Sequence, residues 1–328
     1  MHCVRSCLRM IRFLSWDKES GCRLCRCGSW YLSSVKDFRK STYIVMDKDC
    51  PAIEPIVEGI YKERAEEEED IFVTNEEALL LKDKSAMLIV VDVNLPAMTE
   101  CPELLKSVST IVVLDHHRQN NETIKNAVVS YVEPYASSTC EMVAEILQYI
   151  VDKPKLKNIE ADAMYSGILV DTDNFVIKAG VRTFEAAAFL RRAGADVTRV
   201  RKMFREDMEH CRIRTAIINK AEIYMNEFAI STFDGANVSG ATVVGAKAAN
   251  ALLNIQGIRG SFVLTSLQDC IYISARSIDE LNVQVIMEKF NGGGHLTMAA
   301  AQLKDVTLEE AKQQLEDVLQ QMREDGDI

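Results

Sequence analysis

The sequence predicts a two-domain α/β protein, in which a doubly wound parallel sheet precedes a smaller α/β domain. Two continuous apolar runs, residues 87–91 and 110–114, are typical of parallel strands that are buried on both faces. Segments with apolar residues at helical spacing separate the apolar runs, and this alternation is typical of a doubly wound sheet. The 328 residues also suffice for two domains of ordinary size.

Apolar patterning places the individual elements in order. For the first domain, residues 42–204, it predicts strands at 43–46, 71–73, 87–91 and 110–114 and helices at 53–61, 76–82, 138–150, 159–170 and 183–192. A polar-faced helix over 200–220 is expected to connect the domains, with 205–222 as the linker. For the second domain, residues 223–328, it predicts strands at 221–233, 262–267 and 270–275 and helices at 244–253, 283–290 and 308–322.

Composition excludes several classes of protein. Lys and Arg number 38 against 49 Asp and Glu, and the net charge of −11 is a poor match for duplex nucleic acid. A small anionic ligand remains compatible, because a local pocket can oppose the net charge. No apolar run reaches the roughly 20 residues of a membrane span, and the N-terminus lacks a signal-peptide apolar core. We therefore expect a cytoplasmic protein with no membrane segment in this chain.

Residues 1–41 differ from the rest of the chain and form an atypical leader. They hold both tryptophans and half of the ten cysteines. The spacing of Cys22, Cys25 and Cys27 suits a fragment of a zinc site, but no further Cys or His pair follows at a matching distance. We therefore expect no structural zinc, and the scattered remaining cysteines fit reduced thiols.

Chemically active side chains follow the predicted apolar elements. Asp92 follows the run 87–91, Asp115-His116-His117 ends the run 110–114, and Asp171 follows another apolar stretch. In an open parallel sheet, ligands bind beyond the carboxyl ends of the strands, so these groups can converge. Carboxylates and imidazole suit Mn²⁺ or a similar divalent ion, and two such ions would activate a bridging water.

A plainer interpretation is a set of helix caps and loop residues, and for Asp92 alone we would favour it. The adjacent histidines argue against it, because burial at a strand end is costly for them unless they have partners.

The triplet Asp115-His116-His117 resembles the signature of the DHH phosphoesterases. Independently, Asn291-Gly292-Gly293-Gly294-His295 looks like the glycine-rich motif of the associated DHHA1 substrate-binding domain. Such a run lets backbone N–H groups approach a phosphate, although it could also be a helix stop and turn. Residues 131–139, 167–172 and 273–277 further resemble the catalytic region of GdpP-type cyclic-di-AMP phosphodiesterases, and the likeness spans about residues 42–322.

The resemblance implies hydrolysis of cyclic-di-AMP to linear pApA by a metal-activated water. It implies a site with two Mn²⁺ ions, for which Mg²⁺ or Co²⁺ could substitute. It assigns catalysis to Asp115, His116 and His117, and metal binding to Asp92, His116 and Asp171. The implied substrate-binding residues are Arg118, Ser274, Arg276, Gly292, Gly293, Gly294 and His295.

The resemblance also bears on partners and location. The partner it implies is a cyclic dinucleotide or a short oligonucleotide, and a homodimer is left open. Members of this type often carry membrane helices before the catalytic region, so the chain could be the cytoplasmic part of a membrane-anchored protein.

One expected motif is missing. The family has an N-terminal strand followed by His-x-x-x-Asp-x-Asp, which supplies three further metal ligands, and nothing in residues 1–41 fits it. Back-translating residues 18–28 and reading one nucleotide later permits Lys-Asn-Pro-Asp-Ala-Asp-Ser-Val-Gly-Ala, which contains the missing Asp-x-Asp. Our hypothesis is that the leader is a frame-shifted remnant of this motif.

Two alternative functions are compatible with the sequence. One is an oligoribonuclease of the same fold, with or without 3′-phosphoadenosine phosphate (pAp) phosphatase activity. The other is a nucleotide-binding module that is catalytically impaired because the N-terminal ligands are absent.

Overall fold

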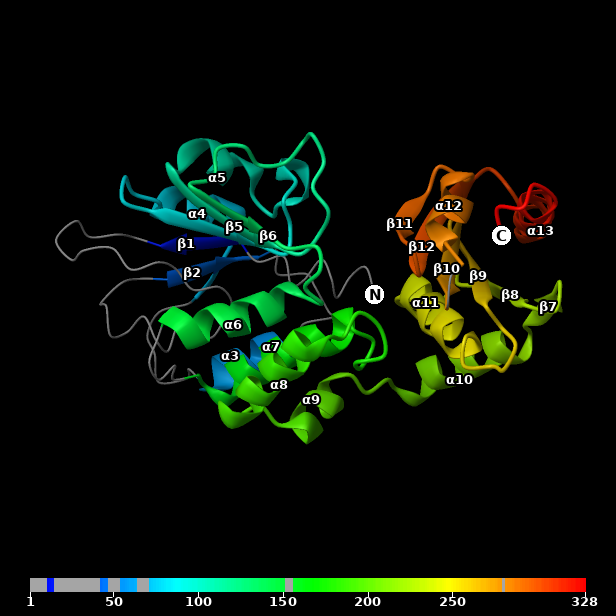
Figure 1. Cartoon of the computed structure of the whole chain (residues 1–328), viewed down its shortest axis with the longest axis horizontal. Helices are drawn as coiled ribbons and strands as arrows, with labels where there is room; N and C mark the ends of the chain where they lie inside the picture. Colours follow the sequence, from blue (N-terminus) through cyan, green and yellow to red (C-terminus); the bar gives the residue numbers. More distant parts are fainter. Residues whose placement is uncertain (1–10, 15–41, 47–53, 64–70, 151–155, 279–280) are drawn as a thin grey trace. The chain divides into compact units, whose positions relative to one another are not determined.

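The computed structural model describes residues 11–14, 42–46, 54–63, 71–150, 156–278 and 281–328 (Figure 1). The chain forms two compact units that divide between Arg205 and Glu206. Each unit combines helices with a six-stranded sheet, which confirms the predicted α/β class. Most of the leader, including the Cys22, Cys25 and Cys27 cluster and the hypothetical frame-shifted motif, lies outside the described residues.

The N-terminal unit is built on a sheet with the strand order β3-β2-β1-β4-β5-β6. The strands are β1 (Ile11–Leu14), β2 (Thr42–Val45), β3 (Phe72–Val73), β4 (Met87–Val91), β5 (Thr110–Asp115) and β6 (Val129–Val132). The pairs β2–β3, β4–β5 and β5–β6 are parallel, as the sequence predicts. Strand β1 differs, because it runs antiparallel to both of its neighbours, β2 and β4.

Helices cover both faces of this sheet (Figure 1). They are α3 (Glu54–Glu63), α4 (Asn75–Leu81), α5 (Pro102–Ser107), α6 (Thr139–Ile150), α7 (Asn158–Asp171), α8 (Val181–Arg192) and α9 (Val197–Met203). Successive residues of β4 point to opposite faces of the sheet and belong to different apolar cores. Ile89 packs with α3, α6, α7 and α8 on one face, whereas Leu88 packs with α4 and α5 on the other. This two-sided burial explains why β4 is apolar throughout and why β5 is apolar between Thr110 and Asp115.

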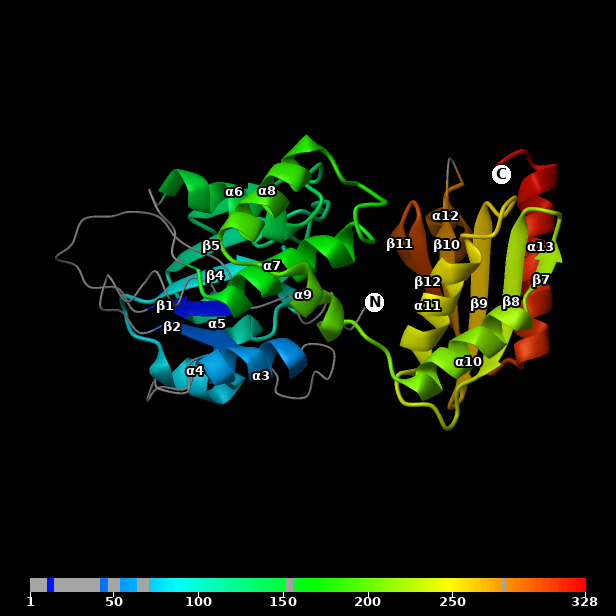
Figure 2. The same ribbon diagram turned by 90° about the horizontal axis from the view of Figure 1, so that it is seen from below.

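The C-terminal unit has a mostly antiparallel sheet with the order β11-β12-β10-β9-β8-β7, in which only β8 and β9 pair in parallel. Its elements are α10 (Met208–Asn219), β7 (Glu222–Tyr224), β8 (Phe228–Asp234), α11 (Ala241–Leu252), β9 (Gly260–Leu267), β10 (Cys270–Ser277), α12 (Val283–Glu288), β11 (Gly293–His295), β12 (Met298–Lys304) and α13 (Leu308–Glu324). Figure 2 shows α11 and α13 on opposite sides of this sheet, and each side has its own apolar core.

Two predicted elements are divided in the structure. The helix expected over 200–220 is two helices, because the Asp207 side chain accepts the N–H of His210 and begins α10 anew. Helix α10 then packs on α11 through Ile217, as part of the C-terminal unit. The strand expected over 221–233 is a hairpin of β7 and β8, turned by Met225 and Asn226, which both have positive φ.

Membrane-spanning helices are not found among the described residues, where every helix is too short or too polar to cross a bilayer.

Candidate metal centre

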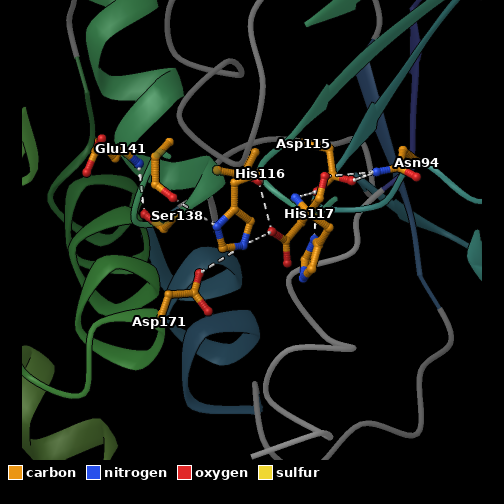
Figure 3. A network of polar contacts seen from close by, with 10 residues as sticks. Asn94, Asp115, His116, His117, Ser138, Glu141 and Asp171 are labelled. Atoms are coloured by element: carbon orange, nitrogen blue, oxygen red, sulfur yellow. Dashed lines mark hydrogen bonds and ion pairs between the residues drawn. The ribbon is translucent and has the colours of Figure 1, made fainter. Parts of the chain in front are cut away.

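Three predicted ligands meet in the N-terminal unit (Figure 3). Asp92 follows β4, His116 follows β5, and Asp171 is the last residue of α7. The Nε2 atom of His116 lies 3.4 Å from Oδ1 of Asp92 and 3.9 Å from Oδ2 of Asp171. All three side chains are at most 8% exposed. The structure thus brings together the three residues for which the sequence predicts metal binding.

The position of Asp92 follows from the end of its strand. Its N–H donates to the carbonyl of Leu114 on the neighbouring β5, at 3.0 Å, so the pairing continues one residue beyond β4. Its φ of 61° then turns the chain away in the left-handed region, which Asp tolerates better than most residues. The Thr139 hydroxyl donates to Oδ1 of Asp92 at 2.9 Å and fixes the carboxylate.

His116 has a defined tautomer. Its Nδ1 lies 3.3 Å from the carbonyl oxygen of Ala136, which can only accept a hydrogen bond, so this contact favours the tautomer with the proton on Nδ1 and a lone pair on Nε2. Burial, followed by the neighbouring His117, lowers the pKa of His116 to about 3. A neutral imidazole with a bare Nε2 is the form that binds a metal ion.

The charges around Nε2 fit a cation. Burial and the nearby Asp171 carboxylate raise the pKa of Asp92 to about 7, because two buried carboxylates repel each other. A divalent ion would relieve this repulsion and accept the lone pair of His116. Among the described residues, Asp92, His116 and His117 also form a group whose ligand atoms all lie within 4.8 Å of one another. The donor set therefore fits a divalent metal.

Asp115 is fully buried and contacts its own neighbours. Its Oδ1 accepts from the backbone N–H of His117 at 3.1 Å and lies 2.7 Å from Nδ1 of that ring. Burial opposes the charge of Asp115, but these bonds outweigh it and lower the pKa of Asp115. Burial also opposes the charged form of His117 and by itself would lower the pKa of that ring. The hydrogen bond to Asp115 and the charge of Asp92 outweigh this effect and raise the pKa of His117. Asp115 therefore orients His117.

Asn94 is a buried member of the site that sequence reasoning missed. Its Nδ2 donates to Oδ2 of Asp115 at 2.5 Å and to the carbonyl of His117 at 3.3 Å. The contact with Asp115 spans 21 positions of the chain, so no local sequence pattern predicts it. The nearest signal is the presence of an amide two residues after Asp92.

The predicted substrate-binding residues divide between the units. Arg118 follows His117 in the N-terminal unit and is exposed. Ser274 and Arg276 lie on β10 of the C-terminal unit, and both are buried. The Nε of Arg276 donates to the side-chain oxygen of Asn250 at 2.7 Å, which fixes the plane of its guanidinium.

Gly292 precedes β11, and Gly293, Gly294 and His295 form this strand. The three glycines differ in their surroundings. A Cβ on Gly292 would lie 2.3 Å from the carbonyl oxygen of Ala300, and one on Gly294 would lie 2.4 Å from that of Met298. These two glycines permit the close approach of β12, which is a structural role. A Cβ on Gly293 would meet nothing within 4 Å, so this position alone has the open space that a ligand requires.

Known proteins resemble both units. The model of the DHH family, N-terminal domain, matches residues 3–168, and that of the DHHA1 domain matches residues 229–324. Cyclic-di-AMP phosphodiesterase PdeA of Listeria monocytogenes is 46% identical over 244 residues, which are 74% of this chain and 37% of that protein. Cyclic-di-AMP phosphodiesterase GdpP of Geobacillus thermodenitrificans is 44% identical over 252 residues, which are 76% of this chain and 38% of that protein.

The chain therefore spans less than two fifths of the length of these two relatives. A crystal structure of an exopolyphosphatase-related protein from Bacteroides fragilis superposes with a TM-score of 0.64 at 19% identity, over 80% of this chain and 76% of that one, which supports the fold. The resemblance predicted from the motifs is confirmed by the two family models and by the relatives. With a DHH model over residues 3–168 and a DHHA1 model over 229–324, the chain belongs to the DHH family.

Proposed function

We propose that this chain is a metal-dependent phosphodiesterase that hydrolyses cyclic-di-AMP to linear pApA. The observation that carries the proposal is the meeting of a bare imidazole nitrogen with two buried carboxylates, at His116, Asp92 and Asp171. The names of the two relatives supply the substrate. We also propose a cytoplasmic location for this chain.

In this proposal Asp92, His116 and Asp171 hold the divalent ion. When bound, the ion lowers the pKa of a water and polarises the phosphate. The imidazole favours Mn²⁺ over Mg²⁺, since Mg²⁺ prefers oxygen ligands alone. The protein's own groups orient these ligands through the Thr139 hydroxyl and the Ala136 carbonyl.

His117 serves the phosphate in this proposal. The Asp115 hydrogen bond raises the pKa of His117 against the effect of burial, which favours the protonated ring, and it also fixes the orientation of that ring. His117 can therefore donate to a phosphate oxygen as negative charge develops.

The remaining substrate contacts are assigned by residue type. Arg276 provides a guanidinium suited to bidentate phosphate binding, with Ser274 beside it on β10. Gly293 leaves room for close approach of a ligand. Arg118 adds an exposed positive charge next to His117, and His295 ends the glycine-rich strand.

Turnover of three substrates tests the proposal. The purified chain is incubated with Mn²⁺ and cyclic-di-AMP, pApA or a short RNA, and products are separated by chromatography. We expect pApA from cyclic-di-AMP, and a loss of at least about 100-fold in His116→Ala. His210→Ala, which changes a histidine of the C-terminal unit, is the matched control and should retain activity.

Wild-type-like turnover by His116→Ala would exclude this site. Preference for short RNA would favour the oligoribonuclease, and binding without turnover at any metal concentration would favour the nucleotide-binding module.

The frame-shift hypothesis for residues 1–41 has a separate test. Sequencing the gene from fresh template through the codon for Thr42 should reveal a different reading frame over residues 18–28. An uninterrupted frame that encodes this leader would refute the hypothesis and leave the chain with fewer metal ligands than its family.

A further inference from the structure

We propose that Glu141 is a positioning residue of the metal centre, whose buried carboxylate holds the loop 136–139 so that it orients His116 and Asp92. The proposal rests on the metal-binding function proposed above. Glu141 lies in the first turn of α6 and is only 2% exposed. It is not a predicted ligand.

The loop 136–139 contacts two of the three predicted ligands. At its beginning, the carbonyl oxygen of Ala136 accepts from Nδ1 of His116 at 3.3 Å and thereby fixes the tautomer. At its end, the hydroxyl of Thr139 donates to Oδ1 of Asp92 at 2.9 Å. A shift of this short segment would therefore disturb both ligands together.

Glu141 holds this loop from inside the unit. The hydroxyl of Ser137 donates to Oε2 of Glu141 at 2.5 Å. The backbone N–H of Glu141 donates in turn to the hydroxyl of Ser138 at 3.0 Å, which caps α6. Figure 3 shows Ser138 between Glu141 and the ring of His116. Both serines that separate Ala136 from Thr139 are thus fixed by one residue.

The same carboxylate also fastens helix α8. The hydroxyl of Thr183 donates to Oε2 of Glu141 at 2.6 Å, and it accepts the N–H of Gly180 at 3.0 Å. Residues 172–180 connect Asp171 to the beginning of α8. The Glu141 carboxylate therefore links the loop 136–139 to the end of the segment that follows Asp171. Segments bearing on all three predicted ligands therefore meet at Glu141.

Burial makes this arrangement rigid. A buried carboxylate is costly without hydrogen bonds, so a conformation that withdraws Ser137 or Thr183 from Glu141 is unfavourable. A merely structural Glu141 would stabilise α6 and nothing more, because an acidic residue in a first turn favours any helix. A positioning Glu141 would in addition control the tautomer of His116.

Glu145 provides a matched control. It lies one turn further along α6, and its carboxylate receives two hydrogen bonds of 2.7 Å from Arg182, without any from the loop 136–139 in the described structure. Glu141→Ala and Glu145→Ala therefore remove the same group from the same helix. Only the first of them loosens the loop.

The test reads the ring of His116 in the full-length chain without metal or substrate. The ¹⁵N shifts of labelled histidines at neutral pH report which ring nitrogen carries the proton. We expect the Nδ1–H form of His116 in the wild type and in Glu145→Ala, and a mixture of tautomers in Glu141→Ala. Glu141→Gln should give an intermediate result, because its amide oxygen can still accept one hydroxyl.

Titration with Mn²⁺ supplies a second readout. Affinity should fall about 10-fold in Glu141→Ala and remain unchanged in Glu145→Ala. An unaltered His116 signal in Glu141→Ala, or the same change in Glu145→Ala, would overturn the proposal. If Glu141→Ala does not fold, Ser137→Ala removes one hydrogen bond to Glu141, and Thr183→Val removes another together with the bond from Gly180. Unaltered His116 signals in both variants would overturn the proposal. Because the tautomer needs no substrate, failure to hydrolyse cyclic-di-AMP leaves this test valid.

Discussion

His116 and His117 are adjacent, yet their surroundings shift their pKa values in opposite directions. Burial lowers the pKa of His116 and leaves its Nε2 bare, whereas the Asp115 carboxylate raises that of His117 against the effect of burial. In the proposed function, these two adjacent residues therefore take different roles, His116 as a neutral metal ligand and His117 as a hydrogen-bond donor to the phosphate. The difference arises from the partners, since the two side chains are chemically identical.

Replacing Asp115 tests this division. Asp115→Asn keeps the volume but removes the charge that orients His117, so we expect hydrolysis of cyclic-di-AMP to fall about 10- to 100-fold at saturating Mn²⁺. Steady-state kinetics of the wild type and of Asp115→Asn measure this fall in the rate of hydrolysis. Unchanged turnover would show that the bond between Asp115 and His117 has no part in the reaction.

The glycine run allows a second residue-level prediction. Gly294→Ala should lower the free energy of unfolding by about 2 kcal/mol or more, because φ is +153° and the new Cβ would meet the backbone of Met298. Gly293→Ala should leave stability nearly unchanged, because its Cβ meets nothing within 4 Å. Urea unfolding compares the two, and equal losses would contradict the assignment.

Sequence reasoning identified the three candidate ligands but missed the residues that support them, for a physical reason. Asp92, His116 and Asp171 each follow an apolar stretch, and a charged or imidazole side chain at such a place stands out. Asn94 contacts Asp115 across 21 positions of the chain, and Glu141, whose bonds to Ser137 and Ser138 are local, contacts Thr183 across 42 positions. Such contacts depend on tertiary packing, which no local pattern encodes.

At the scale of elements, prediction succeeded where burial is continuous. Strand β4 and the residues of β5 between Thr110 and Asp115 are apolar, and the structure buries all of them. Strand β6 was missed because its residues are half-buried or exposed. Strand β12 was missed because Met-Ala-Ala-Ala-Gln-Leu-Lys favours a helix by propensity, whereas its small side chains suit the close approach of Gly292 and Gly294.

Helix α10 contains a histidine, His210, whose contribution to the stability of the fold depends on pH. Its His210 lies against the carboxylate of Asp207 and the carbonyl of Ser239, and these partners raise the pKa of His210. Its contribution to stability is therefore fully present below the unfolded value of 6.5, and it is lost as pH rises through the folded pKa. We expect His210→Gln to lower the melting temperature by a few degrees at pH 5.5 and by less at pH 9.

Thermal unfolding at the two pH values measures this difference. A melting-temperature gap between wild type and His210→Gln that widens toward high pH would contradict the sign of the effect.

At the scale of the whole molecule, each unit has its own apolar cores. Leu315 of α13 and Ile273 of β10 belong to one core of the C-terminal unit, and Ala248 of α11 belongs to the other. We therefore expect residues 206–328 to fold alone and to unfold cooperatively, at a temperature close to that of one transition of the full chain. Calorimetry of the fragment checks this, and a broad non-cooperative transition would show that the unit depends on its partner.

The direction of β1 determines how close a carboxylate placed directly after this strand can lie to the candidate metal centre. Leu14 pairs with Met87 and Thr42, where β4 and β2 begin, so the chain leaves β1 at the edge opposite to Asp92. A motif placed directly after this strand would start about one strand length, roughly 13–17 Å, from Asp92. Carboxylates placed directly after β1 would lie beside Asp92 only if β1 ran parallel to β2 and β4. Cross-strand Hα–Hα contacts in NMR spectra, which distinguish antiparallel from parallel neighbours, report that polarity directly.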